Sequence, residues 1–188
     1  MTAFEFVLLL FNEVPGQRIE GRTKLQKVAY FFGLHLGMGG VLGYRAHYYG
    51  PYSAEVADAA SMLVSLGFLN ETVPSGTLEG QGFERRKYVY ALTEEGKEAA
   101  TVISRHAEPG FINRLQDAVR ELHAVIESDY VPLSFAAKVL WITKGRLESE
   151  TERIQENAEA VGWKLDDAQV TDARGFLNAL NERGFHFA

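Results

Sequence analysis

Two short runs of β-forming residues, separated by a glycine-rich connector, constrain the fold of this chain more than any other feature. The runs are 68–73 (FLNETV) and 85–93 (RRKYVYALT), and the connector PSGTLEGQGFE between them is typical of a hairpin. In KYVYAL, strand alternation places Tyr88 and Tyr90 on one side and Val89 on the other. Most of the remaining patterns are helical, so the sequence predicts a mainly α, α+β protein with a two-stranded ribbon.

Three amphipathic helices are expected before the ribbon. Apolar residues at helical spacing predict the first over about residues 2–13 and start the second at about Thr23. The third is expected over 54–66, with Ser53 as its N-cap and Gly67 just after its last turn. The segment between the second and third helices is rich in aromatic and β-forming residues, so we expect it to be extended.

The order helix, helix, helix, ribbon, helix is that of a winged helix-turn-helix domain. Thr93, followed by two glutamates, is the expected N-cap of the helix after the ribbon. The later patterns are helical, with a long helix at 110–127 and a break at Pro132. We therefore predict a winged-helix domain over 1–105 and a C-terminal helical extension over 106–188 packed on it. The alternative is a generic α+β domain whose hairpin covers one edge of the core.

Composition excludes several classes of function. The chain has no cysteine, which excludes disulfides, thiolate metal sites and a cysteine nucleophile and is typical of a reducing compartment. The five histidines show none of the spacings of metal sites, and the phosphate-binding and serine-nucleophile motifs are missing. We expect no catalytic residue, no metal and no cofactor. Without a signal-type start or an apolar run of about 20 residues, we expect a cytoplasmic protein with no membrane partner.

The third predicted helix would be the DNA-reading helix of such a domain, yet its charged residues are acidic. Its first turns carry Glu55 and Asp58, and it has neither lysine nor arginine. A helix that enters the major groove needs donors and is flanked by phosphates, which repel carboxylates. We expect this helix to pack in the core or to contact a protein. DNA binding through Arg85, Arg86 and Lys87 of the ribbon is the alternative, and it would be weak and sensitive to salt.

Tyrosine is concentrated just before the third helix. Tyr49 and Tyr52 flank Gly50-Pro51, which we expect to form a turn, and tyrosine and arginine are favoured anchors of protein interfaces. The alternatives are that the tyrosines fill the core and that nearby basic residues form a solvated helix face. The predicted protein-binding surface combines the turn with the basic start of the second helix: Tyr49, Gly50, Pro51, Tyr52, Arg22, Lys24 and Lys27.

Three segments, GRTKLQKVAYFFG, YRAHYYGPYSAEVADAASMLVSLGFL and YVYALTEEGKEA, resemble the YwgA-like family and more distantly the SocA-like Panacea domains. In both, a Lys-Leu-Gln-Lys helix is followed by a Gly-Pro turn that opens the next helix. The resemblance covers about residues 1–105, and the helical remainder resembles the YwgA-like tail. Panacea domains act as antitoxins that bind and neutralise protein toxins, and one relative is a proteolytic adaptor. The Pro-Tyr-Ser after Gly50 departs from the usual Panacea form.

Together these features favour a non-enzymatic protein-interaction module of antitoxin-like or adaptor type. Its partner would be a toxin or a protease substrate. The alternative is a winged-helix transcription regulator that binds DNA, and a deep pocket lined by His47 and Glu55 would instead favour an enzyme. The aromatic end RGFHFA would pack on the body or meet a second subunit, which would give a homodimer.

Overall fold

The computed structural model describes residues 1–73 and 88–185. These residues form a mainly helical protein with short antiparallel strands, which confirms the predicted α+β class. In chain order the elements are α1 Ala3–Glu13, a 3₁₀ turn Pro15–Gln17, β1 Arg18–Glu20, α2 Arg22–His35, α3 Gly39–Leu42, β2 Arg45–His47, β3 Gly50–Tyr52, α4 Ala54–Ser65, β4 Leu69–Thr72, β5 Val89–Leu92, α5 Glu94–His106, α6 Phe111–Glu121, α7 His123–Glu127, α8 Tyr130–Thr143, α9 Thr151–Ala160 and α10 Asp167–Asn181.

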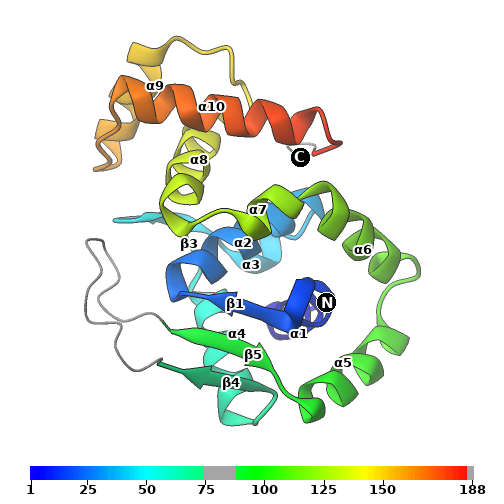
Figure 1. The fold of residues 1–188 in the computed structure, drawn as a ribbon. Coiled ribbons are helices and arrows are strands. Elements are labelled where there is room, and N and C mark those ends of the chain that lie inside the picture. The colour runs from blue at the N-terminus through cyan, green and yellow to red at the C-terminus, as the bar shows by residue number, and fades with distance from the viewer. Residues whose placement is uncertain (74–87, 186–188) are drawn as a thin grey trace.

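The larger sheet has three antiparallel strands in the order β1-β5-β4, where the sequence predicted two. Strands β4 and β5 pair from Leu69 opposite Leu92, and β1 adds Ile19 opposite Tyr90 on the other edge of β5. Strand β1 was missed because three residues are too few to show an alternating pattern. Its addition brings the start of α2 next to the sheet (Figure 1).

Strands β2 and β3 form a separate hairpin, called the hairpin below, and its turn is not where the sequence placed it. His47 pairs with Gly50, so Tyr48 and Tyr49 form the turn and Gly50-Pro51 belongs to strand β3. The prediction of a Gly50-Pro51 turn was therefore wrong. Pro51 fits here because a two-stranded ladder leaves one side of each strand without a hydrogen-bonding neighbour.

The helix starts follow the predicted caps. Ser53 Oγ accepts a hydrogen bond from the backbone N–H of Val56 at 2.9 Å, and Thr93 Oγ1 accepts one from Gly96 at 3.0 Å. Each satisfies a backbone donor that the first turn of a helix leaves unpaired. The expected stripe of α4 is also buried and consists of Val56, Ala59, Ala60 and Leu63.

Three local predictions were wrong. The helix expected over 110–127 is divided into α6 and α7 at Leu122, whose side chain is fully buried. Pro132 does not interrupt the chain but lies in the first turn of α8, where the missing N–H would have no partner inside the helix. Part of the segment expected to be extended between the second and third helices instead forms the single helical turn Gly39–Leu42.

Helix α8 connects the C-terminal helices to the rest of the protein. It packs against α2 and strand β3 on one side and against α10 on the other, and Figure 1 shows α9 and α10 at the end of the molecule away from the sheet. Buried apolar residues from both parts form one continuous cluster. The division at residue 105 stays a prediction. Among the described residues, no helix is both long enough and apolar enough to span a membrane.

Candidate functional site

A cavity of about 400 Å³ lies between α2, the hairpin, α4 and the sheet. This volume is within the usual range of small-ligand sites. Its walls combine apolar side chains with tyrosine, histidine and several polar groups. The lining residues used below are Arg22, Leu25, Gln26, Lys27, His47, Tyr49, Gly50, Tyr52, Ala57, Ala60, Ser61, Val64, Ser65, Glu71 and Tyr90.

A buried lysine lies in the wall of the cavity. Lys27 is only 2% exposed, and its ammonium group donates a hydrogen bond to the carbonyl oxygen of Pro51 at 2.7 Å. Lys138, from α8, is close enough for its charge to act on Lys27. We call Lys27 and Lys138 the lysine cluster. Burial, and secondarily the charge of Lys138, lowers the pKa of Lys27 to about 7. Burial also lowers the pKa of Lys138.

The printed contacts of the lysine cluster are to aromatic rings and to a backbone carbonyl. Among residues 1–73 and 88–185, neither ammonium group forms an ion pair with a carboxylate. Lys138 Nζ lies 5.7 Å from the ring centres of Phe135 and Trp163. The indole N–H of Trp163 donates to the carbonyl of His47 at 2.6 Å, which holds the hairpin against the C-terminal helices. Buried cations are normally paired, so this arrangement is unusual.

Two further features hold the hairpin beside the lysine cluster. The side-chain amide of Gln26 accepts from Ser53 N and donates to Ser53 O, both at 2.9 Å, just before α4. Gly50 has φ +104°, a backbone conformation that favours glycine. A Cβ atom there would lie 3.4 Å from Lys27 Nζ and 3.3 Å from Lys138 Cγ. The strand can approach the lysines this closely because residue 50 has no side chain.

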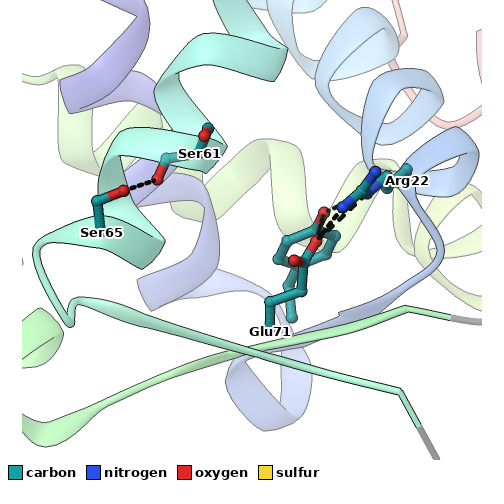
Figure 2. A network of polar contacts seen from close by, with 5 residues as sticks. Arg22, Ser61, Ser65 and Glu71 are labelled. Atoms are coloured by element: carbon teal, nitrogen blue, oxygen red, sulfur yellow. Dashed lines mark hydrogen bonds and ion pairs between the residues drawn. The ribbon is translucent and has the colours of Figure 1, made fainter.

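The opposite end of the cavity carries a fully paired set of polar groups, the arginine cluster of Arg22, Glu71 and Tyr90. Arg22 donates to Glu71 Oε1 through Nη2 at 2.9 Å and to the hydroxyl oxygen of Tyr90 through Nε at 3.1 Å, and Tyr90 in turn donates to Glu71. The Arg22 guanidinium also lies 3.8 Å from the ring centre of Tyr88. In Figure 2, Arg22 and Glu71 meet between α2 and the sheet, across from Ser61 and Ser65 on α4.

Hydrogen bonds decide the protonation of this cluster. Burial opposes ionisation of Glu71, yet the hydrogen bonds from Tyr90 and Arg22 hold its pKa below the ordinary value. Burial, and then the hydrogen bond to Glu71, raises the pKa of the Tyr90 hydroxyl. Glu71 is therefore a carboxylate and Tyr90 a neutral donor at neutral pH, so the cluster joins α2 to the sheet as a closed network.

The structure brings most of the predicted protein-binding residues together. Arg22, Lys27, Tyr49, Gly50 and Tyr52 all line the cavity. Pro51 is buried and contributes its carbonyl oxygen to Lys27, whereas Lys24 is partly buried and does not line the cavity.

The predicted basic surface is not an open patch, and this corrects the sequence interpretation. Lys27 is buried, although the sequence placed it with Lys24 on a protein-binding surface or, as the alternative, on a solvated helix face. Arg22 is half exposed but pairs with Glu71 of its own chain. Helix α2 turns Lys27 inward because the hairpin and α8 cover that side.

Sequence analysis missed several residues of the site. Gln26, Glu71 and Tyr90 gave no signal, because their partners are distant in sequence. Lys138 did give one, because it is a single lysine in the strongly apolar segment 133–143, whose pattern is that of a buried helix. A lysine in such a helix needs a special environment.

The remaining candidates are less informative. Arg85, Arg86 and Lys87 lie outside the described residues. The cavity is lined by His47 but not by Glu55, so the pair that would have favoured an enzyme does not form there. Within the described residues, no group of three histidine, aspartate or glutamate side chains is placed to hold a metal ion.

Comparison with known proteins gives no relative. No protein-family model, no curated protein and no solved structure matches this chain.

Proposed function

We propose that this chain is a non-enzymatic protein-interaction module of the antitoxin-like or adaptor type, as its resemblance to the YwgA-like and Panacea families implies. The hairpin and the cavity beside it would receive a segment of a partner protein. The observation that carries the proposal is the hairpin tip, where Tyr48 is 71% exposed next to Tyr49. The half-buried Tyr49 and Tyr52 and the exposed His47 line the adjoining cavity, and tyrosines beside a pocket are typical anchors of a protein interface.

The outer face of α4 extends this surface. Met62 and Leu66 are more than half exposed. The residue before each of them, Ser61 and Ser65, lines the cavity. Large exposed apolar side chains at the edge of a pocket favour contact with another protein.

The charge of α4 supports a polypeptide rather than DNA as the partner. Glu55 and Asp58 are exposed in its first turns, where a DNA-reading helix meets phosphates. We infer that the N-terminal half is a winged-helix domain. The order α1, α2, α4, β4, β5 and the sheet order β1-β5-β4 support this inference. In such a domain α4 would be the DNA-reading helix, and its acidic start opposes that use.

The test is capture of a partner from native lysate by the full chain. We expect the wild type to retain a stoichiometric protein that the double variant Tyr48→Ser, Tyr52→Ala does not retain. Val161→Ser is the matched control, because Val161 is also exposed but does not line the cavity. It should capture the partner as the wild type does. Thermal unfolding of each variant checks that the fold is retained.

Two results would contradict this function. One is capture that is unchanged by the hairpin substitutions, or no partner at all. The other is binding to duplex DNA tighter than about micromolar at physiological salt, which would favour a transcription regulator instead.

A further inference from the structure

We propose that the cavity binds a monocarboxylate with an apolar or aromatic body, and that the carboxylate pairs with Lys27. This inference uses the cavity of the proposed function and names the chemistry of its occupant. The carboxylate has two sources, a free organic acid or the C-terminal carboxylate of a polypeptide, and the experiment below separates them.

The first argument is the missing acid. Lys27 and Lys138 are both buried, and among the described residues neither forms an ion pair with a carboxylate. An ammonium group has three donors, and the Pro51 carbonyl accepts one from Lys27. A ligand carboxylate would supply the missing negative charge and accept a second hydrogen bond. Lys27 is suited to this role because its side chain forms part of the cavity wall.

The protonation of Lys27 also favours a bound carboxylate. Burial lowers the pKa of Lys27 to about 7, so the protein stabilises its positive charge poorly. A carboxylate bound beside it would raise this pKa again, since opposite charges favour each other's ionised forms. The other titratable groups that line the cavity are His47, Tyr49, Tyr52, Arg22, Glu71 and Tyr90.

The third argument concerns the body of the ligand. Leu25, Ala57, Ala60 and Val64 provide apolar walls, and the hydroxyls of Ser61 and Ser65 provide neutral polar ones. At the far end, Glu71 is a carboxylate that already accepts from Arg22 and Tyr90. The charges of Glu71 and Arg22 offset each other there, so this end offers no unpaired positive charge to a second acidic group of the ligand. The walls therefore suit a compact apolar or aromatic body with one acid.

The test is calorimetric titration of the full chain at pH 6 with two probes of the same shape, phenylacetate and phenylacetamide. For the wild type we expect phenylacetate to bind at least tenfold more tightly than the neutral amide. For Lys27→Met, which keeps the length of the side chain without its charge, we expect equal affinities for the two probes. Binding of the amide to this variant shows that the cavity has formed.

Three results would overturn the proposal. They are equal affinities of the two probes for the wild type, a preference for phenylacetate that survives in Lys27→Met, and binding of neither probe. A second pair of probes, N-acetyl-phenylalanine and its amide, separates the sources. Tighter binding of N-acetyl-phenylalanine than of phenylacetate supports a polypeptide C-terminus, and the reverse order supports a free acid. Partner capture that depends on Tyr48 and Tyr52 is measured separately, so either proposal can fail alone.

Discussion

The two ends of the cavity hold basic residues in opposite situations. In the lysine cluster, Lys27 and Lys138 are buried next to each other without an acid among the described residues. In the arginine cluster, Arg22 is half exposed and bonded to both Glu71 and Tyr90. Within residues 1–73 and 88–185, Arg22, which has the greater access to water, thus has the charged partner, and the buried Lys27 has a backbone carbonyl as its hydrogen-bond partner.

This difference indicates that the arginine cluster is a structural contact and that the lysine cluster is the place for a ligand. The arginine cluster is complete, so its contribution is to hold α2 against the sheet. The lysine cluster carries an electrostatic cost, because burial of a charge without a partner is unfavourable. That cost can be offset by a ligand of opposite charge, and the lysine cluster is therefore where we expect specificity to arise.

The largest effect expected is a pH dependence of stability that Lys27→Met removes. Lys27 has a pKa of about 7 in the folded protein and an ordinary pKa of 10.5. Between these values the unfolded chain binds more protons than the folded one, so the wild type gains stability as the pH rises. This shift sets an upper limit on the order of 4–5 kcal/mol for the gain in stability.

The measurement is urea unfolding of the wild type and Lys27→Met at pH 7 and at pH 10. Groups that do not interact with Lys27 titrate equally in both proteins, so the change in the stability difference reports on Lys27 together with its coupling to Lys138. We expect the wild type to gain roughly 3 kcal/mol relative to the variant over this range. Parallel stability curves would show that Lys27 is solvated and would remove the contrast between the two clusters.

The next largest effect is expected from a substitution that prevents the close approach of the hairpin to the lysines. Gly50→Ala should destabilise the protein by about 2–3 kcal/mol, because φ +104° strains a residue with a side chain and the Cβ atom would crowd Lys27 and Lys138. Gly37→Ala is the control, since Gly37 also has positive φ but a Cβ atom there would meet nothing within 4 Å. It should cost only about 1 kcal/mol. Equal costs, measured by urea unfolding, would show that the lysine cluster tolerates the methyl group.

Local signals predicted the helices of this protein better than its strands. Thr93, Ser53 and Asp166 act as caps because a capping side chain acts within three residues of its own position. Strand β1 and the turn of the hairpin were not predicted, because pairing partners such as Ile19 and Tyr90 are distant in sequence. Pairing of this kind leaves little trace in a short segment.

The sequence indicated which residues gather at the cavity, but not the burial and pairing of their charges. The sequence identified Arg22, Lys27 and the tyrosines of the hairpin as neighbours of one surface, and five of the seven predicted residues line one cavity. It could not show that Lys27 is buried, because burial depends on α8 packing from more than 100 residues away. The pairing of Arg22 with Glu71 could not be predicted either, because the two residues are 49 positions apart in sequence and meet only when the sheet forms.

The smallest effect expected comes from the arginine cluster, and its pH dependence runs in the opposite direction. Glu71→Gln should cost about 1–2 kcal/mol at pH 7, because it weakens hydrogen bonds between charged groups. The folded pKa of Glu71 lies below its ordinary value, so its contribution is present above that value and is lost as the pH falls through the folded pKa. The deficit of the variant in urea unfolding should therefore shrink as the pH is lowered below the ordinary pKa of a glutamate. Glu98→Gln, an exposed glutamate of α5, is the control and should change stability little at either pH. If Glu71→Gln is as neutral as this control, the arginine cluster does not hold α2 to the sheet, and the contrast with the lysine cluster must rest on burial alone.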